Sequence, residues 1–176
     1  MLNLKQQNFI DRQSDNIIKV LPFDLRANEK FEEIKKQIQA IIGNVEVIHR
    51  GSTGLGIAGQ PEIDVYIPVL SGEMPVLATE LEKTWGKPKS IYPDERTKFI
   101  RYVDGTMVEV MLVNKMCESW KEGEMFFDYL KNHEDARKEY EKLKGVGEDL
   151  SYKEYYKRKF EFMNDILLNA VQKYAR

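Results

Sequence analysis

Cysteine and histidine are scarce in this chain of 176 residues, which contains one cysteine and two histidines. A single Cys117 cannot form an internal disulfide, and it excludes a multi-cysteine zinc or iron–sulfur site. His49 and His133 alone nearly exclude a histidine-based metal centre. Any bound metal would therefore be held by carboxylates, whose hard oxygen atoms favour Mg²⁺ or Mn²⁺.

Long apolar runs and an excess of one charge are also missing. No apolar stretch approaches the roughly 20 residues of a membrane span, and the N-terminal sequence lacks the continuous apolar core of a signal peptide. The 27 basic and 29 acidic residues nearly balance, whereas a general nucleic-acid binder carries a basic stripe. We therefore expect a cytoplasmic protein without membrane association, acting on small molecules rather than nucleic acid.

The chain shows no internal repeat and no linker rich in proline, glycine and serine. Hydrophobic residues make up 42% of the sequence, which is typical of a globular protein. We expect one domain over residues 1–176, with a sheet-containing core in 1–114 and C-terminal helices in 115–176.

Hydrophobic periodicity predicts the elements and their order. The first half is expected to contain a helix over 29–42, a strand over 45–49, a glycine-rich loop over 51–60 with one helical turn in 52–57, and a strand over 62–69. A helix that carries Leu77, Leu81 and Trp85 follows, and then a hairpin over 99–113 that turns at Asp104-Gly105. The last expected elements are helices over 118–131, 134–144 and 152–174. This order predicts an α+β fold, in which helices flank a mixed β-sheet and a helical cluster follows.

The glycine-rich stretch HRGSTGLGIAGQPEID, residues 49–64, carries the clearest chemical signal. Because glycine has no Cβ, backbone N–H groups of such a turn can approach an anion closely. Gly51, Ser52 and Thr53 are therefore candidate phosphate-binding residues, and Ser52 adds a hydroxyl donor.

Acidic residues follow this loop on the predicted strand. Glu62 and Asp64 are two residues apart and project from the same face, so their carboxylates can converge on a divalent cation. Glu109, isolated among apolar residues of the hairpin, is the expected third acid. All three are candidate metal ligands and catalytic residues of phosphoryl or nucleotidyl transfer. The alternative is that Glu62 and Glu109 are solvated residues of an open sheet face.

Four blocks of the sequence resemble the GrpB family. They are VLPFDLRANEKFEEIKKQI (20–38), HRGSTGLGIAGQPEIDV (49–65), MFFDYLKNHEDARKEYEKLK (125–144) and YYKRKFEFM (155–163). That family is placed in the nucleotidyltransferase (polymerase-β-like) superfamily, so the resemblance implies a nucleotidyltransferase-like fold. The superfamily pattern of Gly-Ser, a spacer and two alternating acids is present as Gly51-Ser52 and Glu62-Ile63-Asp64-Val65.

The resemblance implies a Mg²⁺-dependent nucleotidyltransferase that joins a nucleoside triphosphate to a small-molecule acceptor. Lys159 matches the family's ending and could reach the triphosphate. His49 could contact a phosphate or brace the turn, and Arg50 could contact a phosphate or be solvated at the surface. Gln60 stands where the family usually has lysine, which favours the alternative of a non-catalytic protein that binds a nucleotide or phosphorylated metabolite. A scaffold acting through its C-terminal helices is a third possibility.

Overall fold

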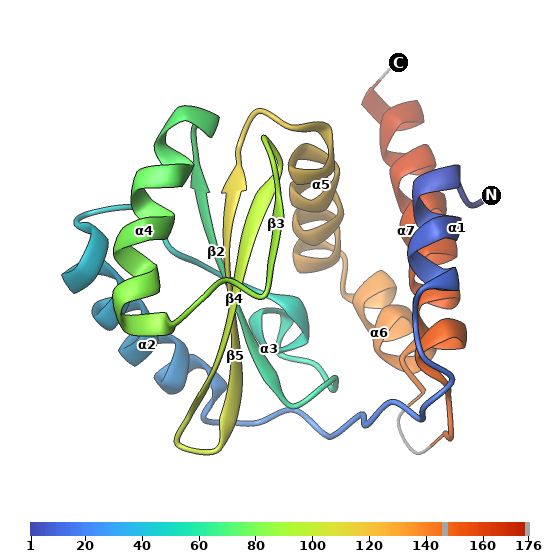
Figure 1. Ribbon diagram of the computed structural model, residues 1–176. Helices are drawn as coiled ribbons and strands as arrows, with labels where there is room; N and C mark the ends of the chain where they lie inside the picture. Colours follow the sequence, from blue (N-terminus) through green and yellow to red (C-terminus); the bar gives the residue numbers. More distant parts are fainter. Residues whose placement is uncertain (146–147, 175–176) are drawn as a thin grey trace.

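Helices cover both faces of a five-stranded mixed sheet in the computed structural model (Figure 1). The structure describes residues 1–145 and 148–174, and in the last helix it describes side chains up to Leu168. The strands are β1 (Ile48–Arg50), β2 (Glu62–Val69), β3 (Ser90–Tyr92), β4 (Arg96–Val103) and β5 (Thr106–Asn114). The α-helices are α1 (Leu4–Asp11), α2 (Ala27–Ile42), α3 (Gly51–Leu55), α4 (Met74–Trp85), α5 (Glu118–Asn132), α6 (Glu134–Leu143) and α7 (Tyr152–Tyr174), and a 3₁₀ turn, η1, spans Ser71–Glu73.

The strands lie in the order β1-β2-β5-β4-β3. β2 and β5 are parallel, while β1 with β2, β5 with β4, and β4 with β3 are antiparallel. The predicted α+β class, with a mixed sheet flanked by helices, is therefore confirmed. The parallel pair needs a long crossover, which α4, β3 and β4 provide.

Two expectations at the element level are wrong or incomplete. The first strand was expected over 45–49, but it covers only Ile48–Arg50, because Gln39 Nε2 donates to Val45 O at 3.0 Å and holds the preceding segment against α2. The helical turn expected in 52–57 is confirmed as α3, which begins one residue earlier, at Gly51. The sequence analysis did not predict α1 or β3. β3 is an exposed three-residue edge strand without an alternating burial pattern.

Alternation along the two parallel strands divides the sheet into an apolar and a polar face. Ile63, Val65 and Ile67 of β2 and Val108, Val110 and Leu112 of β5 are almost completely buried in one cluster with residues of α2 and α4. Glu62, Asp64, Tyr66 and Glu109 project from the other face, over which the chain places α5, α6 and α7 (Figure 1). The acids therefore lie between the sheet and the C-terminal helices.

The C-terminal helices have an apolar cluster of their own, formed by Phe126, Leu130, Tyr140 and Ile166 together with Ile57 from the segment after α3. Beside it, Glu141 Oε1 accepts a hydrogen bond of 2.7 Å from Ala58 N. Of the large hydrophobic side chains described on α5–α7, Met125 and Leu168 are exposed. Among the described residues, no helix combines the length and apolar character that a membrane crossing requires.

Candidate functional site

The sheet register brings the three predicted acids together. Asp64 of β2 lies directly opposite Glu109 of β5, and Glu62 lies two residues before Asp64 on the same face. Burial raises the pKa of Glu62, and the charges of Asp64 and Glu109 raise it further. Burial also raises the pKa of Asp64, with Glu109 adding to the effect. The three carboxylates therefore form one electrostatically coupled group, the acid cluster.

Gly51 lies against this acid cluster. Its φ is +67°, and a Cβ built at this position would lie 1.8 Å from Asp64 Oδ2 and 2.7 Å from Asp64 Cγ. Only glycine tolerates both this backbone conformation and this approach. The sequence pairing of Gly51 with a distant acid thus has a direct physical cause, namely contact between the two residues.

Ser52 is buried and accepts a hydrogen bond of 2.5 Å from Lys144 Nζ. The same ammonium group donates to Tyr155 Oη at 3.2 Å. Lys144 is 3% exposed and lowers the pKa of Asp64 through space. The predicted phosphate-binding serine is therefore connected to the C-terminal helices.

Two further lysines act on the acid cluster. Lys98 Nζ donates to both carboxylate oxygens of Glu109, at 2.9 and 3.1 Å. Lys159 of α7 lowers the pKa of Glu62 and of Asp64, and within the described part of the chain it forms no ion pair with either of them. Lys159 therefore acts electrostatically on the acid cluster, while its contact with a triphosphate stays a prediction.

His49 and Thr53 brace the turn between β1 and α3. The His49 ring stacks on Phe31 with a centroid distance of 4.5 Å, and its Nε2 lies 3.1 Å from Thr53 Oγ1. Thr53 donates its hydroxyl proton to Glu62 O at 3.3 Å, so His49 Nε2 carries the proton in the contact with Thr53. Burial lowers the pKa of His49 to about 4. His49 is therefore a neutral bracing residue in this structure.

Arg50 is directed toward α5. It is paired with Glu124 and stacks on Phe127 at 4.2 Å from the ring centroid, with Trp120 at 5.4 Å. The alternative of a solvated surface arginine is wrong, because Arg50 is 7% exposed. It could reach a phosphate only by leaving Glu124 without its partner.

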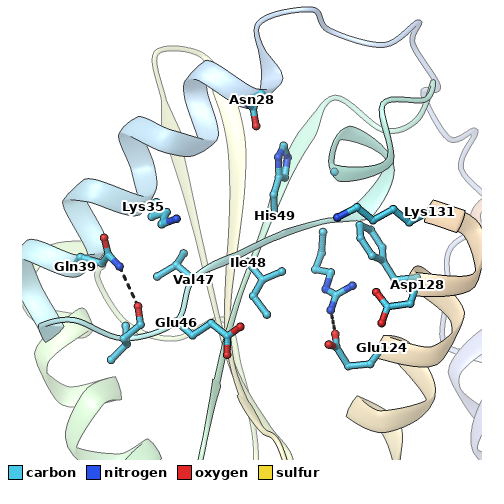
Figure 2. Close-up of a pocket in the computed structure, with 14 residues that line it drawn as sticks. Asn28, Lys35, Gln39, Glu46, Val47, Ile48, His49, Glu124, Asp128 and Lys131 are labelled. Atoms are coloured by element: carbon cyan, nitrogen blue, oxygen red, sulfur yellow. Dashed lines mark hydrogen bonds and ion pairs between the residues drawn. The ribbon is translucent and has the colours of Figure 1, made fainter.

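A pocket of about 610 Å³ opens at the sheet edge beside β1 (Figure 2). Lys35 and Gln39 of α2 line one side, Glu124 and Lys131 of α5 line the other, and His49 lies between them. The predicted phosphate-binding residues therefore lie in two different places. Arg50 also lines this edge pocket, whereas Gly51, Ser52 and Lys159 lie near the acid cluster.

A smaller cavity of about 250 Å³ lies at the start of β2. Glu62 and Thr53 line it together with Phe23, Lys30 and Thr106. Glu62 therefore belongs both to this cavity and to the acid cluster, whereas Asp64 and Glu109 do not line the cavity.

The donor chemistry of Glu62 and Asp64 suits a hard divalent cation, since both supply carboxylate oxygens on one sheet face. In the part of the chain that the structure describes, no three Asp, Glu, His or Cys side chains are grouped to hold a metal ion. Glu109 is hydrogen-bonded to Lys98 through both of its oxygens. Glu62 and Asp64 would therefore hold a cation first.

The sequence analysis missed Lys144, although it ends the block MFFDYLKNHEDARKEYEKLK. Its partner Ser52 is 92 residues away in the sequence, and no local periodicity predicts such a contact. The recurrence of a lysine at the end of a resembling block was the available signal.

The fold and site define a small α+β protein with buried carboxylates and lysines between a mixed sheet and C-terminal helices. A family model described as GrpB protein matches residues 17–169. The chain belongs to the GrpB family, as its sequence blocks suggested.

A solved GrpB structure has the same fold. The crystal structure of the conserved protein GrpB from Enterococcus faecalis superposes with a TM-score of 0.65 at 20% identity, covering 90% of this chain and 100% of that chain. A cytoplasmic RNA terminal U-transferase is a distant neighbour, with a TM-score of 0.40 at 14% identity, covering 82% of this chain and 46% of that one. A search of curated proteins finds no match.

Proposed function

We propose that this GrpB protein binds a nucleoside triphosphate between the sheet and the C-terminal helices and transfers a nucleotidyl group to a small hydroxyl-bearing acceptor. The observation that supports the proposal is the acid cluster, which lies beside a buried serine hydroxyl and three lysines. Carboxylates and ammonium groups that lie close together can receive a metal and a polyphosphate together. The single cysteine and the balanced charge favour a cytoplasmic reaction on a small molecule.

The proposal gives each residue a role. Ser52 and Lys159 receive the phosphate groups, Gly51 allows the backbone to approach them, and Glu62 and Asp64 hold Mg²⁺ or Mn²⁺. When bound, the cation would offset the phosphate charge and acidify the acceptor hydroxyl. Glu109 is the third acid of the proposed site and keeps Lys98 in place.

A second candidate function is binding of a phosphorylated metabolite without turnover. It is favoured by the fact that two groups of the proposed site are already engaged: Lys98 forms an ion pair with Glu109, and Lys144 donates a hydrogen bond to the Ser52 hydroxyl. A phosphorylated ligand could then bind through Ser52 and Lys159 without a metal.

Titration of nucleoside triphosphates with and without Mg²⁺, followed by calorimetry, distinguishes the two candidates. For the transferase we expect affinity at least about tenfold tighter with the metal, and Glu62→Gln should remove this metal dependence. The matched control is Glu46→Gln, an exposed residue beside the edge pocket, which should behave like wild type.

Pyrophosphate release, measured across a panel of hydroxyl acceptors, then tests turnover. Release that requires both Mg²⁺ and Asp64 supports the transferase. Tight nucleotide binding that does not depend on Mg²⁺, without pyrophosphate release for any acceptor, contradicts the transferase and supports the metabolite-binding candidate.

A further inference from the structure

Lys144 carries a buried charge that requires an explanation. It lies at the C-terminal end of α6 and is 3% exposed. Its ammonium group donates to Ser52 Oγ and Tyr155 Oη, and it lies 4.7 Å from the centroid of the Tyr140 ring. In the part of the chain that the structure describes, no carboxylate forms an ion pair with it. Its surroundings nevertheless raise the pKa of Lys144, although burial alone would lower it, and its charge acts on Asp64 through space. The buried ammonium group therefore belongs to the electrostatics of the acid cluster.

The direction of the Lys144–Ser52 hydrogen bond is fixed by chemistry. An ammonium group has donors only, so Ser52 Oγ must be the acceptor. The serine hydroxyl therefore keeps its own proton for another partner, and among the described residues none accepts it. The space on one side of the hydroxyl is closed by the backbone, since a Cβ at Gly59 would lie 2.0 Å from Ser52 Oγ.

We propose that Lys144 is a positioning residue of the phosphate site: it holds Ser52 Oγ as an acceptor and so directs the serine proton toward a phosphate oxygen of the ligand. The positive charge also polarises the hydroxyl, which strengthens the bond that Ser52 donates. This inference rests on the proposed function, because it requires a phosphorylated ligand. It makes the C-terminal segment part of the binding site.

The test compares Lys144→Met, Ser52→Ala and the double variant by calorimetry with inorganic tripolyphosphate as the probe. We expect each single variant to bind about tenfold more weakly, as for loss of a charge-assisted hydrogen bond. Because Lys144 acts through Ser52, the double variant should be no weaker than the weaker single variant. Lys142→Met is the control, since it removes the same charge from an exposed position of α6.

Thermal unfolding controls for stability. Lys144→Met removes the buried hydrogen bonds to Ser52 Oγ and Tyr155 Oη, so it should unfold at a lower temperature than wild type. Binding is therefore compared at a temperature at which every variant is folded, and weaker binding by folded Lys144→Met supports positioning.

Three results would overturn the inference. The first is wild-type affinity in Lys144→Met. The second is a double variant whose loss of affinity equals the product of the two single losses. The third is an unfolded fraction of Lys144→Met at the titration temperature that is large enough to account for the lost binding. If wild-type protein binds no tripolyphosphate, the proposed function fails with it. If wild-type protein binds and Lys144→Met binds equally well, only the role of Lys144 fails.

Discussion

At the scale of single residues, Gly51 and Gly56 share a left-handed backbone, with φ of +67° and +71°, but differ in their surroundings. A Cβ at Gly56 meets nothing within 4 Å, whereas one at Gly51 meets the Asp64 carboxylate. We predict that Gly56→Ala lowers the free energy of unfolding by about 1 kcal/mol through backbone strain alone. Gly51→Ala should lose about 2–4 kcal/mol, because Asp64 must also move. Urea denaturation measures the free energy of unfolding of both variants. Equal losses would show that the Asp64 side chain moves aside without a cost in free energy.

Lys98 is the residue that competes with a metal for Glu109. Its side chain is 28% exposed and that of Glu109 is 15% exposed, so breaking the pair should cost about 1–3 kcal/mol of unfolding free energy. We predict that Lys98→Met nevertheless binds Mn²⁺ several-fold more tightly, since a third carboxylate becomes available. Electron paramagnetic resonance of free Mn²⁺ measures the affinity. Lys87→Met, an exposed lysine, is the control, and unchanged Mn²⁺ affinity in Lys98→Met would remove Glu109 from the metal site.

His49 predicts a pH dependence of stability. Its pKa is lowered from 6.5 to about 4 by burial, while Lys35, Lys131 and the Arg50–Glu124 pair line the same pocket. Between about pH 4 and pH 6.5 the unfolded chain therefore binds a proton at His49 that the folded chain does not bind. The stabilisation is complete above about pH 6.5 and is lost as the pH falls toward 4, by roughly 2 kcal/mol after allowance for partial exposure.

Urea denaturation of wild type and His49→Asn between pH 4 and 7.5 measures this contribution as a difference. The variant should be less stable near neutrality, because it loses the stacking on Phe31, and its stability should fall less steeply with acid. Parallel pH profiles would show that His49 titrates normally in the folded protein.

At the scale of elements, the β4–β5 hairpin sets the register that pairs Glu109 with Ile100, and the parallel pairing of β5 with β2 places Glu109 opposite Asp64. Asp104 and Gly105 both have positive φ, 48° and 77°, as a two-residue type I′ turn requires. We predict that Gly105→Ala lowers the free energy of unfolding by about 1 kcal/mol, while Asp104→Asn is neutral or slightly stabilising. Thermal unfolding measures both effects. A more damaging Asp104→Asn would mean that the aspartate has a role beyond the turn.

The elements that the sequence predicted well are those whose burial alternates or repeats. β2 was predicted with its observed bounds because Ile63, Val65, Ile67 and Val69 alternate with polar residues and are all buried. β3 was missed because it lies at a sheet edge, where Ile91 is 62% exposed and nothing imposes a pattern. The convergence of acids was predictable from strand alternation, whereas the approach of Lys144 to Ser52 depends on how α6 and α7 pack against the sheet.

At the scale of the whole molecule, two apolar clusters lie on opposite sides of a polar layer. One joins the sheet to α2 and α4, and the other joins α5, α6 and α7. Between them lie the acid cluster, its lysines and the hydrogen bond from Ala58 to Glu141. Polar contacts contribute less net stability than apolar burial of similar extent. The division into a core (1–114) and C-terminal helices (115–176) within one domain stays a prediction.

Hydrogen exchange under native conditions can test how these two clusters are coupled. We predict that amides of α6 and α7 exchange through openings of lower free energy than those of β2 and β5, because the polar acid cluster and its lysines, rather than a continuous apolar core, lie between the two layers. Tripolyphosphate should raise the protection of α3 and of the α6–α7 end, since the ligand would be bound from both sides. Amides of α4, on the far face of the sheet (Figure 1), should gain little. Equal opening free energies throughout would show that the polar layer couples the two clusters as firmly as a continuous core, in which case the ligand would stabilise every amide alike.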